Sequence, residues 1–129
     1  MQDFKMSEHN EQVFFFNFLR IMESKYPVLK YVHAIPNGGQ RHIAVATKLK
    51  REGVKASVLD IFVPIPILSY HGLYIEMKYG KNKLTPDQQE YTDFVQKQGY
   101  LVRICYNWIE AVAATFNYLG FELPEELGD

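Results

Sequence analysis

Two short apolar segments of the chain are interrupted by charged residues, and this pattern restricts the fold more than any other feature. Asp60 lies within Val-Leu-Asp-Ile-Phe-Val (58–63), and Glu76 and Lys78 lie within Leu-Tyr-Ile-Glu-Met-Lys (73–78). β-Branched and aromatic residues favour strands, and a buried carboxylate needs a compensating partner. We therefore expect two strands whose charged side chains meet one another.

The segments around these two strands predict helices and further strands. Ser7, Thr85 and Asn107 are expected to cap helices, and Gly53 and Gly120 to end them. The expected elements are a helix from Glu8 to about Lys25, a strand at 31–35, a helix at 42–52, strands at 54–64 and 73–78, a helix from about 86 to 98, a strand at 100–106, and a helix from about 108 to 119.

This order predicts an α/β fold with a mixed sheet, because a hairpin is followed by a β–α–β crossover that places helices on the sheet faces. The 129 residues suit a single domain over 1–129, with a core at about 7–119 and a loose acidic tail at 120–129. The longest apolar run is broken by Asp60 and two prolines, so we expect no membrane segment and a cytoplasmic location. The single cysteine, Cys105, is expected to be a buried thiol.

The charged residues suggest a metal-assisted reaction. Side chains alternate along a strand, so Glu76 and Lys78 share a face, and Asp60 would join them if its strand pairs alongside. Two carboxylates suit Mg²⁺ or Mn²⁺, and a lysine nearby can orient water for phosphodiester hydrolysis. The alternative is a salt-bridged polar cluster without catalytic function at a sheet edge.

The motifs resemble the PD-(D/E)XK nuclease superfamily, whose restriction-endonuclease-like core places an aspartate on one strand and E-x-K on the next. They are most similar to the VRR-NUC domain, of the stand-alone type found in phages. The shared motifs, in order, are Ser7-Glu8 with Gln12, Pro36-Asn37-Gly38-Gly39, Gly53-Val54 leading to Asp60, Glu76-Met77-Lys78, Leu84-Thr85 with Gln88, and Gly99-Tyr100-Leu101-Val102. The chain departs from the pattern at two positions, where the family's glycine and proline are Ser57 and Leu59.

The resemblance implies a DNA endonuclease with a defined set of site residues. Asp60, Glu76 and the Met77 carbonyl would hold the metal, Glu8 would complete the site directly or through water, and Lys78 would position the attacking water. Gln88 is expected at the edge of the site. Glu11, near the capping-box position of the first helix, competes with Glu8 for the ligand role. The residues expected to contact DNA are Asn37, Arg41, Lys48, Lys81 and Lys83.

The resemblance also implies a substrate and an assembly. Stand-alone members are associated with branched DNA, including four-way (Holliday) junctions, which a homodimer with two sites would cut symmetrically. The aromatic residues on the first and last helices exceed what one small core can easily bury and favour the homodimer: Phe14, Phe15, Phe18, Phe116 and Tyr118. The alternatives are a non-catalytic nucleic-acid-binding module and a general or restriction-like nuclease cutting duplex DNA.

Overall fold

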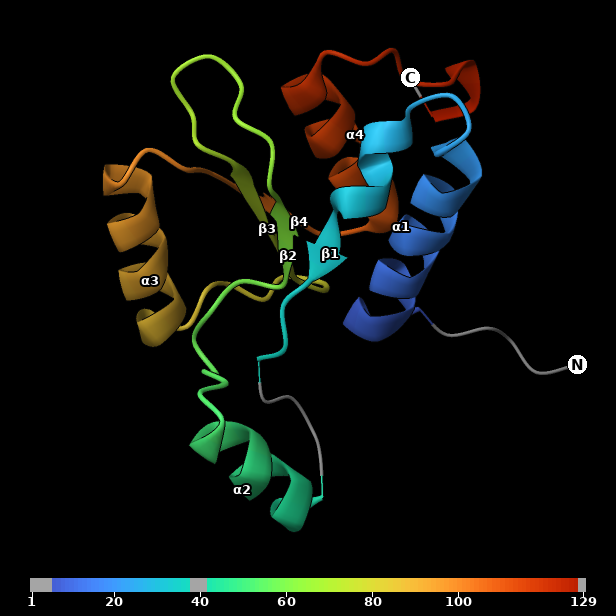
Figure 1. The fold of residues 1–129 in the computed structure, drawn as a ribbon. Helices are drawn as coiled ribbons and strands as arrows, with labels where there is room; N and C mark the ends of the chain where they lie inside the picture. The colour runs from blue at the N-terminus through green and yellow to red at the C-terminus, as the bar shows by residue number, and fades with distance from the viewer. Residues whose placement is uncertain (1–5, 38–41, 128–129) are drawn as a thin grey trace, which may run out of the picture.

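A computed structural model describes residues 6–37 and 42–127 of the chain. The helices and strands form an α/β arrangement in the expected order, with short 3₁₀ helices added (Figure 1). The elements are α1 (Glu8–Met22), η1 (Pro27–Tyr31), β1 (His33–Ala34), α2 (Ile43–Arg51), β2 (Ile61–Val63), β3 (Leu73–Met77), α3 (Pro86–Lys97), β4 (Leu101–Cys105), α4 (Trp108–Leu119) and η2 (Glu125–Leu127).

The sheet is mixed, as predicted. Its strand order is β1-β2-β3-β4. β1 pairs antiparallel with β2, β2 pairs antiparallel with β3, and β3 pairs parallel with β4 through the α3 crossover. Figure 1 shows α3 on one side of the sheet and α1 with α4 on the other. The sheet is therefore covered by helices on both faces.

Alternation along the central strands divides the sheet residues between two apolar layers. Ile61 and Ile75 belong to the larger core, which they share with Phe15 of α1 and Phe116 of α4. The other face packs against α3, with Val95 in a smaller core. The even-numbered strand residues therefore face α3, and the odd-numbered residues face α1 and α4.

The expected helix caps are present. The side chains of Ser7, Thr85 and Asn107 each accept a hydrogen bond from a backbone N–H in the first turn of their helix. Gly120 ends α4 in the left-handed conformation at φ 77°, which glycine adopts without steric cost. The first helix ends at Met22 and not near Lys25, because Pro27 opens a separate 3₁₀ helix that turns the chain toward β1.

Two strands are much shorter than predicted. The segment 31–35 contributes only His33–Ala34, and the segment 54–64 only Ile61–Val63. β2 pairs with β3 over all three of its residues and with β1 over two of them, and the residues before Ile61 belong to neither pairing. Asp60 consequently lies just before β2, although its carbonyl accepts a hydrogen bond from the Ile35 N–H at 2.7 Å.

The apolar residues of the tail and of the outer helices pack more fully than expected. The expectation of a loose tail is wrong, because Phe121 stacks on Tyr26 with ring centroids 4.1 Å apart and Leu127 packs against the main core. Of the aromatic residues expected to exceed the core, Phe15, Phe116 and Tyr118 are buried, whereas Phe14 is 39% exposed. Most of these aromatic residues therefore belong to the core, and the homodimer stays a prediction.

Helix α2 differs from the other helices in its surroundings. None of its nine residues is buried, and Figure 1 shows it standing apart from the sheet and its covering helices. Ile43 is 81% exposed. No helix in residues 6–37 and 42–127 is long and apolar enough to cross a membrane.

Candidate active site

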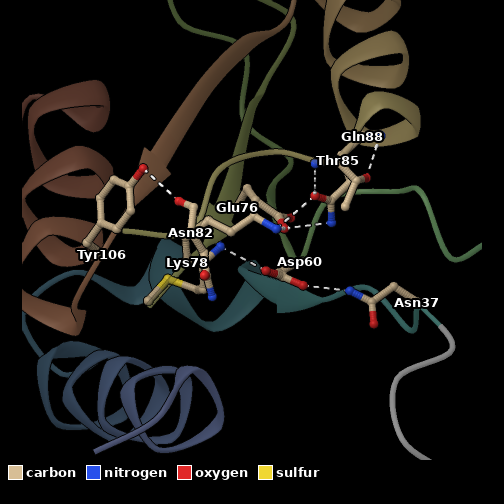
Figure 2. Close-up of polar contacts among 9 residues, drawn as sticks. Asn37, Asp60, Glu76, Lys78, Asn82, Thr85, Gln88 and Tyr106 are labelled. Atoms are coloured by element: carbon tan, nitrogen blue, oxygen red, sulfur yellow. Dashed lines mark hydrogen bonds and ion pairs between the residues drawn. The ribbon is translucent and has the colours of Figure 1, made fainter. Parts of the chain in front are cut away.

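Strand register places Asp60 directly across from Glu76. β2 and β3 pair Ile61 with Ile75 in antiparallel register, so the residue before Ile61 faces the residue after Ile75. Directly opposed residues of antiparallel strands project from the same face. The two carboxylates predicted from separate segments are thus brought together at one end of the sheet (Figure 2).

Asp60 is held by hydrogen bonds from two directions. The Asn37 side-chain amide donates to Oδ1 at 2.6 Å, and the Met77 backbone N–H donates to Oδ2 at 2.8 Å. Met77 lies between Glu76 and Lys78, so the second bond joins Asp60 directly to the E-x-K segment. Asn37, predicted to contact DNA, orients the Asp60 carboxylate in this structure, and its contact with DNA stays a prediction.

Glu76 is a buried carboxylate with incomplete hydrogen bonding. Its side chain accepts a hydrogen bond from Gln88 on Oε2 at 3.0 Å, whereas Oε1 is buried and has no hydrogen-bond partner among the described residues. Burial, reinforced by the negative charge of Asp60, raises the pKa of Glu76 to about 8, although Lys78 acts in the opposite direction. A positive charge in addition to that of Lys78 is therefore needed beside Glu76 to favour its ionised form.

Lys78 is held between Glu76 and Gln88. Its Nζ lies 3.6 Å from Glu76 Oε2 and donates to Gln88 Oε1 at 2.8 Å. The same Gln88 oxygen accepts the Thr85 N–H at 3.0 Å, which completes a capping box at the start of α3. One glutamine therefore couples the helix N-terminus to both charged residues of the E-x-K segment (Figure 2).

The ion pair alone does not explain this cluster. A structural salt bridge is expected to satisfy its own polar atoms, because an unsatisfied buried group costs free energy. Here one oxygen of Glu76 stays without a partner in the described part of the chain. A cationic ligand would satisfy this oxygen, and so would a proton on Glu76 shared with the neighbouring Asp60 carboxylate.

The two glutamates of α1 have different surroundings. Glu11 is only 5% exposed, and its Oε1 accepts the Trp108 backbone N–H at 2.8 Å, at the start of α4. Glu8 is exposed and lines the same cleft as Asp60, together with Gln12. Glu11 therefore anchors α4 and does not compete with Glu8 for the site.

Direct coordination by Glu8 is not supported by the geometry. Within the described ranges, no three residues among His, Cys, Asp and Glu gather closely enough to hold a metal ion. Asp60 and Glu76 thus form a two-carboxylate site, and Glu8 contributes to the adjoining cleft.

Cys105, the expected buried thiol, is 3% exposed, and burial raises its pKa to about 12.

The expected DNA-contacting lysines lie in two places. Lys81 and Lys83 are exposed on the loop between β3 and α3, and Lys48 is exposed on α2. Arg41 lies outside the described residues.

Leu59, which stands where the family has proline, is fully buried and packs in the smaller core beneath α3. The leucine that replaces the family's proline is therefore accommodated by packing in this core.

Sequence reasoning missed a wide cleft beside Asp60. It has a volume of about 890 Å³ and lies between α1 and the segment after β3. Phe16, Arg20 and Tyr79 line it, although none belongs to a motif that the sequence singled out. Gln12, Phe16 and Arg20 are four residues apart, which places them on one side of α1. This spacing was the sequence pattern that could have identified the cleft wall.

Fold and site together define an α/β domain with two opposed carboxylates and a lysine at one end of a mixed sheet. No protein-family model and no curated protein matches the sequence. A solved structure described as "VRR_NUC domain protein" superposes with a TM-score of 0.72 at 29% sequence identity, covering 96% of this chain and 92% of that chain. The chain therefore has a nuclease-like domain with the VRR-NUC fold, which confirms the predicted resemblance to the VRR-NUC domain.

Proposed function

We propose that the chain is a Mg²⁺- or Mn²⁺-dependent endonuclease that hydrolyses phosphodiester bonds in DNA, with Asp60, Glu76 and Lys78 at its site. The observation that carries this proposal is the buried Glu76 Oε1, which lacks a partner among the described residues and lies across the sheet from a second carboxylate. Divalent cations that prefer oxygen ligands fit such a donor set.

The residues present fit a metal ion in their chemistry. Asp60 and Glu76 would hold the cation, with the Met77 carbonyl as a further ligand and Glu8 acting through water. When bound, the ion would lower the pKa of water and neutralise charge developing on the phosphate. Gln88 and Asn37 keep the carboxylates in place, because each donates a hydrogen bond to one of them.

Lys78 supplies a positive charge at the site from the protein, in addition to the charge that a bound metal ion would supply. Its side chain is nearly buried, and its hydrogen bond to Gln88 restricts where Nζ can lie. An ammonium group held beside the two carboxylates can orient the attacking water and stabilise the charged transition state. The lysine is held before DNA binds, so little reorganisation is needed at the reaction step.

For the substrate, we propose branched DNA, including four-way junctions. The exposed Lys81 and Lys83 follow the E-x-K strand, whereas Lys48 lies on the separate helix α2. Basic residues in two separate places suit a backbone that bends through the site, and phosphate contacts of this kind carry no sequence information. A homodimer would present two sites to the symmetric strands of a four-way junction.

The proposal is tested by cutting assays on linear duplex, flapped and four-way DNA of shared sequence. Each substrate is incubated with Mg²⁺, with Mn²⁺ and with EDTA at fixed salt. We expect metal-dependent cutting that is fastest on the four-way junction and has little sequence dependence. Equal cutting of linear duplex would favour a general nuclease. Tight DNA binding without cutting in either metal would favour a non-catalytic binding module.

A further inference from the structure

The cleft beside Asp60 extends well beyond the carboxylate site. Asp60 and Met77 stand at the point where the cleft meets that site, and Arg20 lines it further along α1. Glu8 and Arg20 are separated by twelve residues of one helix, which corresponds to about 18 Å. A volume of about 890 Å³ lies within the range of pockets that hold organic ligands, roughly 300–1,000 Å³.

One wall of the cleft is a short turn that presents an aromatic ring. Tyr79 is 43% exposed. The Asn82 N–H donates to the Tyr79 carbonyl at 3.2 Å, and the turn between them requires Gly80 at φ 63°. The Tyr106 hydroxyl also donates to the Asn82 carbonyl at 3.1 Å (Figure 2). The turn that carries the Tyr79 ring is thus tied to the strand end of β4.

The opposite wall is a stripe along α1. Gln12, Phe16 and Arg20 recur every four residues and line the cleft, as residues on one side of a helix do. Phe15 and Leu19 on the neighbouring side are buried in the main core. This wall is consequently fixed by packing and combines an apolar ring with a terminal cation.

We propose that this cleft binds one unpaired nucleotide of the DNA strand being cut, with its base against Tyr79 and Phe16 and a neighbouring phosphate near Arg20. Bases in a duplex are stacked and paired, so an aromatic wall can stack only on a base that has left the helix. Arg20 supplies charge for the phosphate backbone. The inference rests on the proposed nuclease function and specifies that, in branched DNA, one nucleotide at the branch point leaves its base pair and enters the cleft beside the cut.

The test measures binding in EDTA, so that its outcome is independent of cutting. Two branched DNA molecules are compared: one with a single unpaired nucleotide at the branch point, and one with an abasic residue there. We expect the intact nucleotide to bind roughly 5- to 150-fold more tightly, from the contribution of base–aromatic stacking. Tyr79→Ala should remove this preference, whereas Tyr79→Phe, which keeps the ring, should retain it.

Matched variants separate the cleft from general surface effects. Tyr31 is 57% exposed and is not among the cleft residues, so Tyr31→Ala should leave the preference unchanged. Arg20→Gln should weaken binding to both DNA molecules and reduce the salt slope by about one, and Arg103→Gln is its control. A free mononucleotide should not compete at concentrations that saturate the DNA; efficient competition would instead assign the cleft to soluble nucleotides.

The outcomes distinguish this inference from the proposed function. Equal binding of the intact and abasic DNA by the unmodified protein would overturn the cleft assignment, even if the protein cuts DNA. A preference that persists in Tyr79→Ala would overturn it as well. A preference that depends on Tyr79 in a protein that cuts no DNA would support the cleft and contradict the nuclease.

Discussion

The Met77 backbone N–H donates a hydrogen bond to Asp60 Oδ2 at 2.8 Å. This bond joins the residue just before β2 to the middle of the E-x-K segment on β3. It fixes the Asp60 carboxylate with a backbone group that, among substitutions at position 77, only proline would remove. The spacing between the two carboxylates is therefore set by the main chain of the sheet.

Two substitutions of Asp60 should distinguish the effect of its negative charge on cutting from the effect of its hydrogen bonds on stability. Asp60→Asn should abolish cutting yet fold normally, because the Asn37 amide can turn to match the new amide group. Asp60→Ala should also abolish cutting, and it should lower the free energy of unfolding by about 1–3 kcal/mol, because the Met77 N–H loses its partner. Cutting assays and urea denaturation check both variants, with the exposed Asp93→Asn as control. Normal cutting by folded Asp60→Asn would remove Asp60 from the site.

Lys78→Ala should slow the chemical step by orders of magnitude and reduce DNA affinity only slightly. The reason is that Lys78 is nearly buried beside Glu76, whereas exposed lysines supply most phosphate contacts. Single-turnover cutting and binding titrations measure the two effects separately. Lys97→Ala, on the last turn of α3, is the control. A variant with the normal single-turnover rate would make Lys78 a structural ion-pair partner.

Gln88 acts as a positioning residue, so Gln88→Ala should reduce the cutting rate by roughly 10- to 100-fold and shift its pH profile to higher pH. The shift follows because the ionised form of Glu76 loses a hydrogen-bond donor. Thr85→Ala is a matched control for the helix cap, since it should cost a similar stability of about 1 kcal/mol while leaving Gln88 between Glu76 and Lys78. Equal pH profiles in Gln88→Ala and the unmodified protein would indicate that Gln88 only caps α3.

The raised pKa of Glu76 makes the stability of the metal-free protein depend on pH. Between its ordinary value of 4.5 and the folded-state pKa of about 8, the folded protein keeps a proton that the unfolded chain has lost. Stability contributed by this group therefore falls as pH rises through that window. Thermal unfolding in EDTA at pH 5.5 and 8.5 should show this fall in the unmodified protein, relative to Glu76→Gln. The same fall in both proteins would assign the dependence to other groups.

Binding of Mg²⁺ should oppose this effect, because the cation competes with the proton on Glu76. The midpoint of Mg²⁺ activation should consequently move to lower concentration as pH rises from about 6 to 8. Calorimetric titration of Mg²⁺ at the two pH values measures the same linkage without DNA. Identical Mg²⁺ affinity at both values would show that Glu76 does not bind the metal.

The protein is predicted to be a homodimer in solution, with α2 at the interface. Ile43 and Val45 are 81% and 45% exposed on different sides of a helix with no buried residue, and exposed apolar groups can mark interfaces. Light scattering at micromolar concentration should give twice the chain mass. The double variant Ile43→Ser with Val45→Ser should be monomeric, whereas Leu68→Ser, at a residue 97% exposed on a separate loop, should not. A monomeric unmodified protein would contradict the prediction.

The sequence by itself determined the order of the elements and the identity of the charged site. Capping residues such as Ser7 and Thr85 act within a few residues of the chain, so local pattern was sufficient to place the helix starts. Asp60 and Glu76 were recognisable because a charge within an apolar segment conflicts with its surroundings. The alternation of strand residues also placed Glu76 and Lys78 on one face.

Only the tertiary structure decided which partner each of these residues has. Glu11 and Glu8 look equivalent along the chain, yet the position of α4 gives Glu11 the Trp108 N–H at 2.8 Å and leaves Glu8 in the cleft. The length of β2, which pairs over three residues with β3 and over two with β1, was likewise decided by the tertiary structure. The cleft lined by Arg20 and Tyr79 exists because helix and turn meet across 59 positions of sequence. Hydrogen-bond partners and cavities of this kind arise from long-range packing, which local sequence patterns do not encode.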